Sequence, residues 1–155
     1  MIRINFKNFK GFNDSKITDA NGKEIISFEK VKALPTRACY SIVNANHEKI
    51  GRIEKRRYNF GLVDLPQIII SVNNDKIEIQ KDMKELKEFY EIKGSNFSIS
   101  GNWDGPQFNI SKNEKVLASV NVQKEESGGT YLVDIIDKAN ENQVLCILFA
   151  LSWIR

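Results

Sequence analysis

The C-terminal stretch from Val144 to Ile154 limits what this chain can fold into. It reads VLCILFALSWI, eleven residues that are apolar apart from Ser152. A surface helix is apolar on one side only, so this stretch must be enclosed by the chain or enter a membrane. A membrane span needs about 20 apolar residues, and runs of about 10–14 are more often core helices. Residues 137–143 are too polar to extend the run. We therefore predict a buried helix that does not span a membrane.

Short strands and turns precede this stretch. Apolar and polar residues alternate in 2–6 and 76–80, as in half-buried strands, and residues 67–72 are rich in isoleucine. Further strands are predicted at 97–100 and 131–136. Asn21-Gly22 stands between two apolar runs, and this dipeptide is a strong hairpin signal because both residues tolerate positive φ. The sequence therefore predicts a chain built mainly from hairpins.

One hairpin unit recurs along the chain. Residues 17–30 align with residues 42–55, and a third copy spans 108–124 with a one-residue shift. Each copy has a strand, a turn containing asparagine, and a second strand that ends at lysine. Gly51 interrupts the alternation in the second copy, which predicts a β-bulge there.

A helical spacing interrupts the strand pattern at residues 82–90. Met83, Leu86 and Phe89 or Tyr90 recur at this spacing, and Asp82 is a possible cap. We predict a short helix there. We count about twelve short strands, and a sheet of that many strands usually curls or closes. We therefore predict one mainly β domain over residues 1–155, a closed antiparallel β-barrel of about twelve strands around the central hydrophobic C-terminal helix.

The order of several motifs resembles one family. The motifs are Gly101-Asn102-Trp103, Phe108-Asn109-Ile110, Asn113-Glu114-Lys115 with Ala118, Thr130 to Ile135, and Val144 to Ile154. In these features the chain resembles the LURP-one-related family, whose tubby C-terminal fold is shared with phospholipid scramblases. The resemblance implies a twelve-stranded barrel around a hydrophobic helix. The helix of this family often carries an acidic residue near its end, where this chain reads Ser152-Trp153-Ile154-Arg155.

No catalytic constellation stands out in the sequence. His47 is the only histidine and lies in a predicted turn, so a His-based triad or metal site has no second candidate. Cys39 and Cys146 lie in apolar surroundings, which predicts buried reduced thiols. There is no Cys-x-x-Cys motif and no glycine-rich phosphate loop. We therefore expect no enzyme, no cofactor and no metal. The N-terminus lacks an apolar signal segment, which predicts a cytoplasmic protein.

Positive charge is concentrated in the N-terminal part. Residues 1–60 hold 13 Lys/Arg and 6 Asp/Glu, whereas residues 61–155 hold 10 and 14. The densest cluster is formed by Arg52, Lys55, Arg56 and Arg57. Lys55 and Arg57 would share a strand face and could hold a phosphate-bearing headgroup. The alternative is that these residues form a solvated strand end. Runs of charged residues more often have this role.

Two function hypotheses follow. The first is a non-enzymatic binding or scaffold domain that contacts a protein partner or anionic phospholipid headgroups, as a peripheral membrane protein. Its support is the basic N-terminal part and the resemblance, because tubby proteins hold phosphoinositides. The alternative is a small enzyme or ligand-binding barrel with a pocket at one barrel mouth. Nucleic acid is not an expected partner, because the aromatic residues do not interleave with the basic ones.

Trp103 lies in a predicted turn. It is either an exposed binding residue or a residue that packs within the turn.

Overall fold

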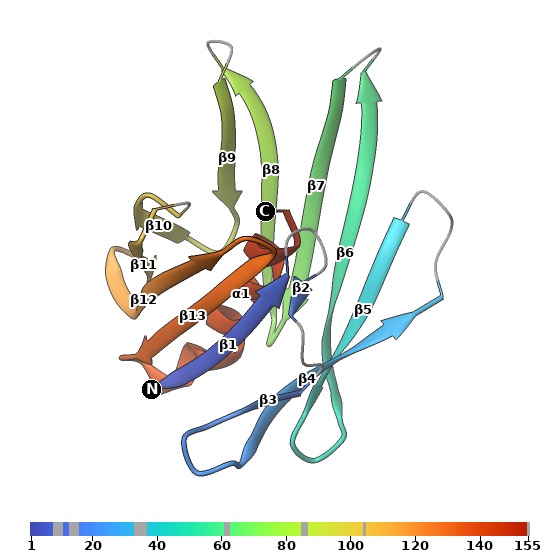
Figure 1. The fold of residues 1–155 in the computed structure, drawn as a ribbon. Coiled ribbons are helices and arrows are strands. Elements are labelled where there is room, and N and C mark those ends of the chain that lie inside the picture. Colours follow the sequence, from blue (N-terminus) through green and yellow to red (C-terminus); the bar gives the residue numbers. More distant parts are fainter. Residues whose placement is uncertain are drawn as a thin grey trace.

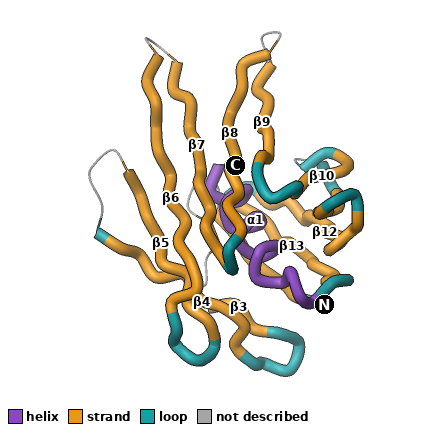
Figure 2. The backbone as a smooth tube through the Cα atoms, turned by 180° about the vertical axis from the view of Figure 1, so that it is seen from behind, coloured by secondary structure: helices purple, strands orange, loops and turns teal. Residues whose placement is uncertain are grey.

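The computed structural model describes residues 1–7, 11–12, 16–32, 37–60, 63–84, 87–103 and 105–154, with the backbone alone at several strand ends. The described chain is mainly β, with antiparallel strands in two sheets and one C-terminal helix (Figure 1). The helix lies between the two sheets, as the view from behind also shows (Figure 2). The predicted mainly β class and the C-terminal helix are therefore confirmed.

One sheet contains both the first and the last strand of the chain. Its six strands, in spatial order, are β10 (Phe97–Gly101), β11 (Gln107–Lys112), β12 (Lys115–Glu125), β13 (Gly128–Ile135), β1 (Ile2–Lys7) and β2 (Gly11–Phe12). β1 pairs with β13 through the whole of its length, so the N-terminal strand lies beside the last strand. The alternation in residues 2–6 is confirmed, because Ile2, Ile4 and Phe6 are buried and their neighbours exposed.

The other sheet follows the order of the chain. Its seven strands are β3 (Lys16–Thr18), β4 (Glu24–Val31), β5 (Arg37–Asn44), β6 (Lys49–Phe60), β7 (Val63–Val72), β8 (Asp75–Lys84) and β9 (Lys87–Lys93). Each strand pairs antiparallel with the next, which makes the sheet a meander of hairpins.

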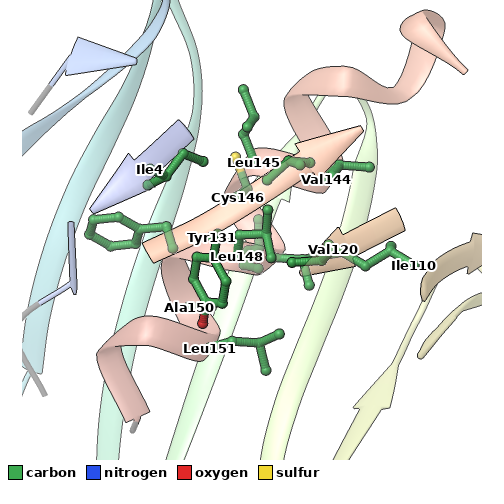
Figure 3. Packing of buried hydrophobic residues seen from close by; sticks show 14 of the residues in the cluster. Ile4, Ile110, Val120, Tyr131, Val144, Leu145, Cys146, Leu148, Ala150 and Leu151 are labelled. Carbon is green, nitrogen blue, oxygen red and sulfur yellow. The ribbon is translucent and has the colours of Figure 1, made fainter. Parts of the chain in front are cut away.

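The core is built around α1 (Glu141–Ile154), which follows the short 3-10 helix η1 (Lys138–Asn140). No side chain from Val144 to Leu151 is more than 3% exposed. The helix contacts strands of both sheets, and Figure 3 shows its side chains packed among inward-facing residues such as Ile4, Ile110 and Tyr131. A helix that is apolar on all sides needs such walls on all sides, and the two sheets supply them.

A partly buried polar cluster ties the two sheets to the helix. The Asp75 carboxylate, at the start of β8, accepts hydrogen bonds from Lys112 Nζ at 3.2 Å and from Gln143 Nε2 at 3.0 Å. Lys112 ends β11 of the other sheet, and Gln143 lies in the first turn of α1. Burial raises the Asp75 pKa, but hydrogen bonds from Gln143, Ser95 and Lys112, with the Lys112 charge, outweigh burial and lower it. One carboxylate therefore connects three elements.

The structure corrects the helix predicted at residues 82–90. β8 and β9 pair from Glu78↔Lys93 up to Lys84↔Lys87, so these residues form a hairpin (Leu86 lies outside the described residues). A nine-residue helix is only marginally stable by itself. The strand ladder instead continues from a β8 that is already paired with β7, and Phe89 and Tyr90 favour strands. Sheet pairing therefore overrides the local helical spacing.

The three repeated units share one irregularity. In each, the second strand has an extra residue shortly after the turn, opposite Ile17/Thr18, Ile42/Val43 or Ile110/Ser111. The bulge predicted near Gly51 is thus confirmed, and its equivalents occur in the other two copies. Gly51 itself is required by packing, because an added Cβ would clash with the Ser71 carbonyl oxygen of β7.

The described strands do not form the single closed barrel that the sequence predicted. Within the described part of the chain, the strand ladders form two separate sheets and no ladder joins one to the other. The sheets approach each other where β9 leads into β10, and these two strands are in contact. The count of about twelve strands is close to the 13 of the described residues.

Candidate functional site

The predicted basic cluster does not form one surface in the structure. The Lys55 side chain is 8% exposed and lies on the inner face of β6, on the same side as Ile53. Its Nζ donates to the Trp153 carbonyl oxygen at 3.5 Å and lies 5.4 Å from the Trp153 ring centroid. The last helix carbonyls carry partial negative charge, so an ammonium stabilises this end of α1. Lys55 thus contacts the core helix.

Arg52 and Arg56 lie on the opposite face of β6. Arg56 pairs with Glu54 at 3.2 Å, and Arg52 Nε donates to Cys39 Sγ at 2.7 Å. Of Arg57 the structure describes the backbone, which pairs with Pro66 of β7. Arg52 and Arg56 therefore share a face with a carboxylate between them, and Lys55 is separated from them by the sheet. An anion contact by all four residues stays a prediction.

A pocket of about 260 Å³ opens where α1 begins. Three segments form it: the β3–β4 turn with the start of β4, the β5–β6 turn, and the residues of η1 and α1 that face them. The lining residues are Asp19, Lys23, Glu24, Ile25, Asn44, Ala45, Asn46, Lys138 and Glu141. The pocket thus joins two equivalent turns of the repeated unit to the first residue of the core helix.

The two turns have the same internal hydrogen bonds. Asp19 Oδ1 accepts from the backbone N–H groups of Asn21 and Lys23, each at 2.9 Å. Asn44 Oδ1 accepts from the corresponding groups, two and four residues further along, at 2.9 and 3.0 Å. Side chains that accept from backbone N–H groups in this way fix the turn. The walls that these turns contribute are therefore held by their own hydrogen bonds.

The pocket holds an excess of negative charge. Asp19, Glu24 and Glu141 are partly sheltered, whereas Lys23 and Lys138 are exposed. Burial raises the Glu141 pKa, the nearby Lys138 charge lowers it, the Asp19 carboxylate raises it, and the net direction is upward. Asp19 of the turn and Glu141 of the helix both line the pocket, and their like charges repel each other. A cation between them would relieve this repulsion.

The sequence did not reveal this pocket as a site. Asp19 and Asn44 are 25 residues apart, and Glu141 is about a hundred residues further on. The available signal was the repeat itself, because an equivalent Asp and Asn begin the two turns. What could not be seen was that the helix begins beside both turns. His47 lies in the second turn, where it is exposed and adopts φ 63°, as the turn assignment anticipated.

The cysteines and the tryptophans are buried or packed against the core. Cys39 and Cys146 are buried and free, as predicted, and burial raises the Cys146 pKa well above its usual range. Trp103 is half-buried and packs against the core, which favours the turn-packing role. Trp153 is 6% exposed and contacts the Tyr40 and Phe149 rings at the end of α1.

Among the described residues, no three His, Cys, Asp or Glu side chains are placed to hold a metal ion.

The fold and the pocket define a class of protein: two antiparallel sheets that enclose an apolar C-terminal helix, with a polar pocket at one end. A family model described as LURP-one-related matches residues 2–152, and the chain belongs to this family. Searches of curated proteins and of solved structures gave no match. In the part of the chain that the structure describes, α1 and the other helical segment are too short to cross a membrane.

Proposed function

We propose that this chain is a non-enzymatic binding domain and that its ligand enters the pocket at the start of α1. The observation that carries the proposal is the pocket itself: turns that are equivalent in the repeat and the first residue of the core helix form its walls. Ligand pockets have volumes of about 300–1,000 Å³. At about 260 Å³, this one suits a small polar molecule or one group of a larger molecule.

The interior of the fold leaves little room for another ligand site. In lipocalin-like barrels the ligand occupies the lumen. Here the side chains of α1 occupy the space between the sheets, and those from Val144 to Leu151 are buried. In this proposal the two sheets act as one barrel-like shell around the helix. Contacts between β9 and β10 support closure on one side. A ligand then binds at an end of the shell.

The chemistry of the lining residues favours binding over catalysis. The walls offer carboxylates, ammonium groups, side-chain amides and two small apolar surfaces, and Asp19 Oδ1 already holds its own turn. Such groups recognise charge and hydrogen-bonding pattern. The enzyme alternative predicts that a bound compound is chemically changed, whereas our proposal predicts that it is recovered unchanged.

Contact with anionic phospholipid headgroups is a second candidate. The net charge of residues 1–60 and the exposed position of Arg52 on the outer face of β6 support it. The pairing of Arg56 with Glu54 weakens it, because a carboxylate lies within the proposed contact surface. A protein partner could use the same surface. Its binding would not require lipid, and this distinguishes it from binding to headgroups.

The pocket proposal can be tested by NMR with small-molecule fragments. We expect amide shifts to change in the two turns and the first turn of α1. Ala45→Trp should fill the pocket and abolish these changes. Ala20→Trp is the matched control, because Ala20 is exposed at the equivalent position of the other turn and does not line the pocket. Changes that survive Ala45→Trp, or that occur only elsewhere, would contradict the proposal.

A further inference from the structure

The charges of the pocket are distributed in two layers. The carboxylates of Asp19, Glu24 and Glu141 are partly sheltered, and no salt bridge joins them to another described residue. The ammonium groups of Lys23 and Lys138 belong to exposed side chains. Lysine carries its charge on a flexible stem, so these two groups can reach a ligand from the rim. Among the lining residues, the more sheltered charges are thus negative and the exposed charges are positive.

We propose that the pocket takes a zwitterionic group, an ammonium separated from a phosphate or carboxylate by a short carbon chain. This deepens, and rests on, the proposed binding function. The ammonium lies between the Asp19 and Glu141 walls, and the anion faces Lys138 and Lys23. The amide oxygen of Asn46 offers a further acceptor for an ammonium N–H group.

Ligands with a single charge match the pocket less well. A simple cation would satisfy the carboxylates but would leave the rim lysines without an anion. A simple anion would meet Lys138 but would also approach the three carboxylates. A divalent metal is disfavoured because, among the described residues, the acidic side chains do not converge as metal ligands would. A zwitterion is the small ligand whose two charges match both layers.

The test compares three small probes by calorimetry and NMR on the full chain. Ethanolamine phosphate carries both charges, ethylamine only the ammonium, and ethyl phosphate only the anion. We expect ethanolamine phosphate to bind at least about tenfold more tightly than either half, because each charge-assisted contact contributes about 1.5–3 kcal/mol. Vesicles of phosphatidylcholine with and without phosphatidylethanolamine then distinguish a lipid headgroup from a free molecule as the source of this group.

Two substitutions separate the layers. Glu141→Gln should weaken both ethanolamine phosphate and ethylamine by about tenfold, because a charge-assisted contact is lost. Lys138→Met should weaken ethanolamine phosphate and leave ethylamine unchanged. Lys30→Met is the control, because Lys30 is exposed on β4 and does not line the pocket.

Each other outcome has a distinct meaning. Equal binding of ethylamine or of ethyl phosphate would overturn the zwitterion assignment, as would an unchanged affinity in Lys138→Met. The pocket function would survive that result if neutral fragments still bind in an Ala45-dependent way. If none of the three probes shifts the pocket amides, the ligand class is also wrong, and the fragment experiment decides separately whether the pocket binds at all.

Discussion

The Lys55 ammonium lies 3.5 Å from the Trp153 carbonyl oxygen and 5.4 Å from the Trp153 ring centroid. β6 and the last turn of α1 are thereby joined by a charge–dipole contact and by a contact between a cation and an aromatic ring. Lysines are rarely this buried unless they have partners. The position of Lys55 is therefore explained by the helix end, and Lys55 links β6 to that end of α1.

Substituting Lys55 should test that relationship. Lys55→Met keeps the length of the side chain and removes the charge, and we expect a loss of about 1 kcal/mol in the free energy of unfolding. Lys55→Glu should cost clearly more, because it places a carboxylate beside the negative end of the helix. Urea unfolding measures both. Lys49→Met, at an exposed position of β6, is the control, and equal effects of Met and Glu at position 55 would contradict the assignment.

The enclosed position of α1 makes a second prediction. Leu148 is 0% exposed in the middle of the helix. Leu148→Asp would bury a charge with no partner, which costs more than a domain of this size can lose. We expect no soluble, cooperatively melting protein. Leu148→Met, a volume-conserving change, should cost less than about 1.5 kcal/mol. A Leu148→Asp variant that expresses and melts cooperatively would refute the buried-helix architecture.

Sequence reasoning reached the parts of the fold that depend on local pattern. The apolar run from Val144 onward predicted the core helix, and the interruption of strand alternation at Gly51 predicted the bulge there. It failed at residues 82–90, where the pairing of β8 with β9 decides the structure, and at Lys55. Side-chain alternation correctly separated Lys55 from Arg56, but no pattern showed which face is inward. The pocket is lined by Asp19, Asn44 and Glu141, which only the tertiary structure brings together.

Acid should weaken the cluster around Asp75. Its pKa in the folded protein lies below the usual 3.8, so the stability that it contributes is present above that value. That contribution is lost as the pH falls through the lowered folded pKa. Asp75→Asn should cost about 1–2 kcal/mol at neutral pH and reduce the loss of stability below about pH 4. Thermal unfolding from pH 7 to pH 2.5 measures this, and parallel profiles for the two proteins would exclude Asp75 as the source.

The equivalent turns predict opposite effects at equivalent residues. Gly22 and His47 occupy the same turn position, with φ values of 79° and 63°. A side chain costs about 1–2 kcal/mol in this conformation, partly offset by the flexibility that glycine adds to the unfolded chain. His47→Gly should therefore stabilise by up to about 1 kcal/mol, and Gly22→Ala should destabilise by about 1 kcal/mol.

Ala45→Gly is the control for the turn experiment. Ala45 is exposed and is not among the described residues with positive φ, so glycine there should only destabilise. Chemical denaturation of the three variants gives the comparison. If His47→Gly destabilises as Ala45→Gly does, the left-handed conformation at His47 does not carry the expected cost.

The placement of the basic residues makes a prediction for liposome flotation. If anionic headgroups contact the outer face of β6, then Arg52→Glu and Arg56→Glu should each reduce flotation with phosphoinositide-containing liposomes. A folded Lys55→Met variant should float like the parent chain, because Lys55 lies on the inner face. Binding should also fall as salt is raised, since exposed charges are screened over about 8–10 Å at physiological ionic strength. Equal and negligible flotation with and without phosphoinositide would remove the lipid candidate and leave the pocket as the site to pursue.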